Sequence, residues 1–144
     1  MINWINQQDE SWEGVFKSIF FLNDENQQDL SIYIENSSIA DYAEKCVESL
    51  NSLPETIINK ICKKIIKCAK KGGISEDFKL PKLEKATDIL KYCWFTTVYV
   101  SIPKSESSIS YIVEGEGEWG EVIGFVIKNN RLIYVGIDYF DHMR

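Results

Sequence analysis

The 144-residue sequence lacks the features that identify several common classes of protein. No apolar run approaches the roughly 20 residues that a membrane-spanning helix needs. The first residues, MINWINQQDESWEG, have neither a basic start nor an apolar core, so they do not resemble a secretory signal peptide. We therefore expect a cytoplasmic protein that does not associate with a membrane.

Paired cysteines and clustered histidines are also missing. Cys46, Cys62, Cys68 and Cys93 form no C-x-x-C pair, and His142 is the one histidine, near an end of the chain. Most of these cysteines fall on or beside apolar helix faces, where a free cysteine behaves as a small hydrophobic residue. A histidine at a fraying chain end is a poor general base or metal ligand. Cysteine and histidine thus provide no catalytic set and no metal site, and we expect a protein that is not an enzyme and needs no cofactor.

Positive charge is in deficit, with 16 Lys and Arg against 22 Asp and Glu and a net charge of −6. Duplex binding relies on basic residues that neutralise phosphates, so nucleic acid is not an expected partner. Six lysines between Lys60 and Lys71 are typical of the solvated face of an amphipathic helix. No Arg or aromatic residue is interleaved with them to stack on bases. The charge does permit a basic protein partner.

The patterns that are present predict one α+β domain spanning 1–144. Apolar residues recur at helical spacing over 37–50 and 52–71, and a shorter helix is expected over 84–92. Strands are predicted over 12–22, 30–35, 94–102, 109–114, 121–128 and 131–138. Asn129 and Asn130 tolerate the positive φ of a tight hairpin between the last two strands. We expect an antiparallel sheet of about four to six strands, with two or three helices mainly on one face.

The last two predicted strands are apolar on both faces, so the second face of the sheet needs a cover. The hairpin formed by 12–22 and 30–35 is one candidate for that cover. A second subunit or a partner protein is another. The sequence leaves these alternatives open.

The stretch GEGEWG at 115–120 matches G-x-G-x-x-G, but no helix opens after it and no βαβ unit surrounds it. We interpret it as a turn rather than a dinucleotide site. Carboxylates gather around it, and four interpretations remain: a catalytic dyad, a Ca²⁺ or Mg²⁺ site, a contact surface anchored by Trp119, and a solubilising turn with Trp119 in the core. The residues we predict for partner contact are Glu116, Glu118, Trp119, Glu121, Asp138 and Asp141.

The stretch 111–138 resembles the C-terminal part of small bacterial domains of unknown function. Their signature is a Trp, an acidic pair, a His-Gly step and a strand–turn–strand ending in Val-Gly. The residues that match are Trp119, Glu121, Gly124 and Gly136. Val122 and Ile123 stand where the signature has the second acid and the histidine, so no role of that histidine carries over.

Such domains resemble, in size and architecture, the immunity proteins of bacterial polymorphic toxin systems. The resemblance implies a non-catalytic binding protein that blocks a toxin domain through an acidic surface. We expect such a surface to favour a basic toxin domain as the partner. The alternative is a homo-oligomeric scaffold, such as a homodimer, or a small-ligand-binding domain that uses its second sheet face.

Overall fold

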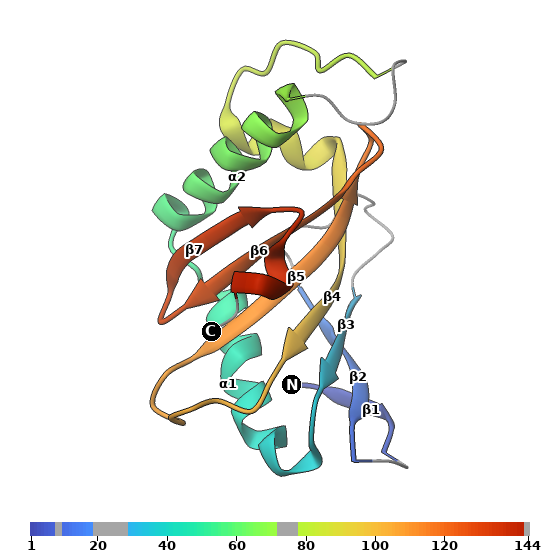
Figure 1. Cartoon of the computed structure of the whole chain (residues 1–144), viewed down its shortest axis with the longest axis vertical. Coiled ribbons are helices and arrows are strands. Elements are labelled where there is room, and N and C mark those ends of the chain that lie inside the picture. Colours follow the sequence, from blue (N-terminus) through green and yellow to red (C-terminus); the bar gives the residue numbers. More distant parts are fainter. Residues whose placement is uncertain (8–9, 19–28, 72–77, 143–144) are drawn as a thin grey trace.

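Seven strands form one sheet in the computed structural model, which describes residues 1–7, 10–18, 29–71 and 78–142 (Figure 1). The strands are β1 (Asn3–Asn6), β2 (Trp12–Lys17), β3 (Asp29–Ile34), β4 (Cys93–Val100), β5 (Ser110–Gly117), β6 (Val122–Lys128) and β7 (Arg131–Gly136). The helices are α1 (Ala40–Asn51) and α2 (Glu55–Lys70), with short 3₁₀ helices η1 (Ser37–Ile39), η2 (Ala86–Lys91) and η3 (Tyr139–His142).

The strands stand side by side in sequence order, β1 to β7. Every neighbouring pair is antiparallel except β3 and β4, which are parallel. A parallel pair needs a long crossover, and the chain supplies one through α1, α2 and η2. The predicted α+β class is confirmed, but the sheet is mixed at this one position and larger than four to six strands.

The additional strand is β1, which was not among the six strands predicted from the sequence. Its residues, NWIN, lack a period-two pattern, and it is a strand because Asn3 pairs with Val15 of β2. The hairpin expected over 12–35 does not lie across the second face. Its strands β2 and β3 extend the sheet edgewise, so that interpretation of the cover is wrong. Residues 19–22 of the predicted first strand lie outside the described part of the chain.

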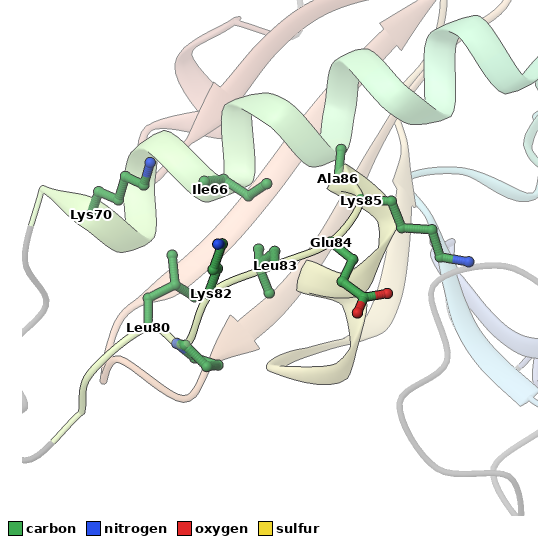
Figure 2. A pocket seen from close by; sticks show the side chains of 9 residues that line it. Ile66, Lys70, Leu80, Lys82, Leu83, Glu84, Lys85 and Ala86 are labelled. Atoms are coloured by element: carbon green, nitrogen blue, oxygen red, sulfur yellow. The ribbon is translucent and has the colours of Figure 1, made fainter.

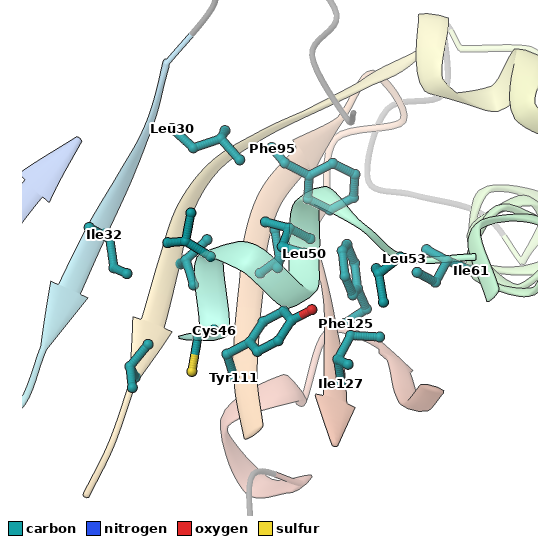
Figure 3. Close-up of a cluster of buried hydrophobic side chains, with 14 of the residues drawn as sticks. Leu30, Ile32, Cys46, Leu50, Leu53, Ile61, Phe95, Tyr111, Phe125 and Ile127 are labelled. Carbon is teal, nitrogen blue, oxygen red and sulfur yellow. The ribbon is translucent and has the colours of Figure 1, made fainter. Parts of the chain in front are cut away.

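Both α-helices pack on the same face of the sheet, here called the inner face, and they fill it with aliphatic and aromatic side chains (Figure 3). Leu50 from α1 and Ile61 from α2 are fully buried there together with Phe95 and Phe125 from the sheet. The predicted apolar face of α2 is confirmed, with Ile58, Ile61, Cys62, Ile65 and Ala69 buried. The predicted third helix is the 3₁₀ helix η2.

Two turns in the C-terminal part have the backbone that their residues favour. Asn129 and Asn130 have φ values of 52° and 60°, which confirms the tight hairpin between β6 and β7. The 115–120 stretch is a turn only from Glu118 onward, because β5 extends to Gly117. Gly120 takes a φ of 90° in that turn. No helix within the described residues is long and apolar enough to cross a membrane.

Candidate binding surface

The outer face of the sheet, opposite the helices, carries side chains of a different kind. Cross-strand pairing aligns one continuous line of residues from β2 to β7: Glu13, Tyr33, Tyr99, Ile112, Val126 and Tyr134. The next line consists of Val15, Ser31, Thr97, Glu114, Gly124 and Gly136. Directly opposed residues on one face lie within side-chain contact of each other. The outer face therefore gathers tyrosines and carboxylates from segments far apart in the sequence.

Four aromatic rings on this face form a row in which each ring contacts the next. We call them the aromatic row: Tyr33, Tyr99, Phe140 and Tyr139. The ring centroids of Tyr33 and Tyr99 are 6.0 Å apart, and those of Tyr99 and Phe140 are 5.0 Å apart in an edge-to-face arrangement. Phe140 and Tyr139 are also separated by 5.0 Å. Tyr33 and Tyr99 are half-buried, and Phe140 is 56% exposed. The row thus runs from an open part of the sheet to the C-terminal 3₁₀ helix.

Glu114 of β5 fixes the row to the sheet. The hydroxyl of Tyr139 donates a hydrogen bond of 2.7 Å to Oε2 of Glu114. Burial raises the pKa of Tyr139, and its hydrogen bond to Glu114 and the charge of Glu114 raise it further. Burial followed by the charge of Glu114 raises the pKa of Tyr99 in the same direction. Both phenols therefore remain protonated near neutral pH and remain able to donate hydrogen bonds.

A glycine provides the space that η3 occupies on the outer face. A Cβ atom at Gly124 would lie 2.5 Å from the ring of Tyr139, so only glycine lets that ring lie on β6. Next to it, the ring of His142 stacks on Tyr134 with centroids 3.9 Å apart. The backbone N–H of Asp138 donates to the hydroxyl of Tyr134 at 3.0 Å. These contacts hold η3 over β5–β7.

The outer face of β2–β4 is left open by the elements that the structure describes. Of those elements, η3 alone lies on the outer face, and it lies over β6 and β7 with an edge on β5 (Figure 1). Glu13 and Ser31 are exposed on this open part, and the half-buried side chains of Tyr33 and Tyr99 lie beside them. In the part of the chain that the structure describes, η3 thus covers the outer face over β5–β7 and leaves it open over β2–β4.

The acidic residues predicted for partner contact do not form one group. Glu116 is exposed on the outer face, between Trp94 of β4 and Val122 of β6. Asp138 and Asp141 are exposed in and beside η3. These three carboxylates share the outer side of the molecule with the aromatic row.

Glu118 and Glu121 instead lie toward the helices. Burial raises the pKa of Cys93 to about 12, with further contributions from Cys62 and from the charge of Glu118. Burial also raises the pKa of Cys68 in α2, and the charge of Glu121 adds to that shift. Strand β5 continues past Glu116 to Gly117 before it turns, so the two later acids leave the outer face.

Trp119 is 1% exposed and belongs to the inner core. Its ring lies against Gly117, where any side chain would strike it, and 6.1 Å from the ring of Phe78. The turn points this ring inward, so it offers no contact surface. Of the interpretations weighed for this turn, the structure has the one in which Trp119 folds into the core.

Metal-binding geometry is not found in the described residues. Within them, no three His, Cys, Asp or Glu side chains lie close enough together to hold an ion. The carboxylates that are close in sequence, such as Glu114, Glu116 and Glu118, are spread along β5 and its turn.

Sequence reasoning did not select Glu13, Tyr33 or Tyr99 as site residues. A signal was nevertheless present: both tyrosines alternate with buried aliphatic residues, which places them opposite the core face. Their proximity could not be predicted, because it depends on the parallel pairing of β3 with β4.

The fold and this surface define a small mixed-sheet α+β domain with one face packed by helices and the other partly open. The chain belongs to the family described as domain of unknown function DUF6985, whose model matches residues 2–142. Neither a curated protein nor a solved structure matches the chain significantly.

Proposed function

We propose that this protein is a non-catalytic binding protein whose open outer face contacts a basic region of a partner protein. The observation that carries the proposal is that Tyr33 and Tyr99, at the open end of the aromatic row, lie among carboxylates. Tyrosine is enriched at the centres of protein interfaces because its ring buries a large area and its hydroxyl still finds a partner. Tyr33 and Tyr99 pack against each other on the open face and are half-buried, so part of each side chain remains accessible.

Charge on the open part of the outer face, and beside it on β5, supports a basic partner. Glu13, Asp29 and Glu116 are exposed, and none has an ion-pair partner among the residues the structure describes. Register places these three acids with one cation, Lys17, on the outer side of β2–β5. A positive surface would meet uncompensated negative charge here, which speeds association and selects against acidic partners.

An immunity role is the form of this function that we favour. The resemblance of 111–138 to domains that are similar to immunity proteins supports it, as does the net charge of −6. A toxin domain that handles nucleic acid presents a basic surface, and an acidic protein can cover that surface. The proposed mechanism is therefore occlusion of a basic site by the outer face.

The test is a pull-down with the tagged protein from lysate of its own organism, at low and at physiological salt. The informative variant is the double charge reversal Glu13→Lys with Glu116→Lys. Its matched control is Glu48→Lys with Glu106→Lys, two exposed acids outside the open face with the same change in net charge. We expect one stoichiometric partner that wild type and control retain and the outer-face variant loses, with salt weakening its recovery.

Two outcomes would contradict this function. Equal recovery of the partner by both double variants would show that the outer face is not the contact surface. Recovery of the protein alone, at either salt concentration, would contradict the existence of a partner. Thermal melts of both variants provide the control for folding.

A second candidate function is self-association near β7. Three apolar side chains are unusually exposed there: Ile133 at 47%, Ile137 at 53% and Phe140 at 56%. Exposed apolar residues that cluster mark interaction sites. Light scattering on wild type and on Ile137→Glu distinguishes the candidates, since a dimer that this substitution dissociates would favour a homo-oligomeric scaffold.

A further inference from the structure

A groove beside helix α2 is bordered mainly by basic residues, whereas the open outer face is acidic. It lies between the C-terminal half of α2 and the connecting segment 80–86, with a volume of about 590 Å³ (Figure 2). Ile66 contributes from α2, and Leu80 and Leu83 contribute from the connecting segment. Lys70, Lys82 and Lys85 border the groove, and Glu84 is the one acid among its described lining residues. The groove thus combines an aliphatic floor with a rim of three cations and one acid.

The groove lies in the most basic part of the sequence. Residues 60–91 hold ten of the sixteen basic residues and four of the twenty-two acids, a net charge of +6 in a chain of net −6. The rest of the chain therefore carries −12. Lys91 pairs with Asp88, but Lys70, Lys82 and Lys85 have no ion-pair partner among the described residues. An acidic ligand would gain these contacts without breaking an existing salt bridge.

The connecting segment also presents free backbone. From Lys79 to Glu84 the chain is neither helix nor strand, and its N–H and C=O groups have no hydrogen-bond partner within the described residues. Five of its six residues retain N–H donors, since only Pro81 lacks one. Unpaired backbone beside an apolar groove is what an extended peptide requires when it binds by main-chain pairing.

We propose that this groove binds an extended peptide segment in which acidic and apolar residues alternate. Alternate side chains of an extended chain point in opposite directions, so one set fills the aliphatic floor and the other meets the lysines. Nucleic acid is a poorer fit, because the groove offers aliphatic side chains and no aromatic ring for bases to stack on. The proposal is independent of the outer face, which selects a basic partner.

The experiment uses the full chain and a fluorescently labelled peptide of alternating Glu and Leu, with binding followed by anisotropy. The comparison peptides are alternating Lys and Leu, and polyglutamate. The informative variant is Lys70→Glu with Lys82→Glu. Its matched control is Lys60→Glu with Lys64→Glu, exposed on the same helix but outside the groove, with the same change in charge.

We expect the Glu–Leu peptide to bind wild type and the control, and to bind the groove variant about tenfold more weakly or worse, as loss of charge-assisted contacts implies. The Lys–Leu peptide should not bind. Equal weakening by both double variants, or equal affinity for polyglutamate, would overturn the groove in favour of diffuse electrostatic attraction. Absence of binding by the Glu–Leu peptide would also overturn the proposal. Binding of sodium decanoate without the peptide would replace the peptide with a small amphipathic carboxylate.

Discussion

The two faces of the sheet differ in how far their side chains are buried and in how much each face contributes to stability. The inner face is closed by two helices and contains Phe95, Phe125 and Trp119 at 1% exposure or less. Among the described residues, the outer face is covered in part by a four-residue 3₁₀ helix, and Tyr33 and Glu13 remain accessible there. Area removed from water stabilises the fold in proportion to its apolar content, so the inner face carries most of the stability. The outer face is free to retain residues suited to contact.

The largest expected effect is the removal of an inner-face ring. We expect Trp119→Ala to lower the free energy of unfolding by about 3–5 kcal/mol, because it leaves a cavity beside Phe78 and Gly117. Urea denaturation measures this change. Glu118→Ala, in the same turn but exposed, is the control and should be nearly neutral. A loss below 1 kcal/mol for Trp119→Ala would show that the ring is not part of the core.

Alkaline pH should lower the stability of the fold first through the buried thiols on the inner side. Burial raises the pKa of Cys46 and of Cys93 to about 12, above the ordinary thiol value of about 8.5. A group with a raised folded-state pKa contributes stability below its unfolded pKa and loses it as the pH rises. Between about pH 9 and pH 11, each thiol should therefore lower the free energy of unfolding by about 1.4 kcal/mol per pH unit.

Urea melts across that pH range measure the slope, and Cys93→Ala should flatten it. The outer phenols Tyr99 and Tyr139 start from a higher ordinary value, about 10, so their contribution begins later. A slope unaffected by Cys93→Ala would contradict the assignment to this thiol.

On the outer face, Gly124→Ala should have the largest effect on stability. The new Cβ would lie 2.5 Å from the ring of Tyr139, and overpacking of this kind costs about 1–3 kcal/mol. The loss should shrink in a Tyr139→Ala background, because the clashing ring is then absent. A double-mutant cycle by urea denaturation measures this coupling, and additive effects would contradict the contact.

Removal of the Tyr139 hydroxyl should have a smaller effect. Tyr139→Phe deletes the 2.7 Å hydrogen bond to Glu114, and a bond to a carboxylate contributes about 1.5–3 kcal/mol at most. Glu114 is only half-buried and regains water, so we expect a loss near the lower end. Amide exchange in η3 should rise in this variant while exchange in α2 stays unchanged. An unchanged η3 would mean that the hydrogen bond does not hold it.

Charge reversal on the open face should change stability least. Exposed surface substitutions usually stay within about 0.5 kcal/mol, and we expect this of Glu13→Lys. The melting temperature should match that of Glu48→Lys within error. A large loss would indicate a structural role for Glu13 and would weaken its assignment to partner contact.

Local patterns predicted the elements that depend on near neighbours. The apolar spacing of α2 and the Asn129–Asn130 turn are satisfied by residues within a few positions of each other, so both predictions are confirmed. Strand β1 was missed because its pairing with β2, rather than its own pattern, makes it a strand. Glu118 and Glu121 were grouped with Glu116 because sequence proximity cannot show where β5 turns away from the outer face.

The α+β class, the amphipathic helices and the acidic balance can be predicted from the residues alone, since they follow from composition and short periodicities. The parallel pairing of β3 with β4, the inward position of Trp119 and the contact of Tyr33 with Tyr99 became evident in the folded structure. The reason is physical: burial and strand pairing are contacts between distant segments, and their free energy depends on the whole assembled sheet. Both candidate surfaces, the acidic outer face and the lysine-rimmed groove, arise at that level.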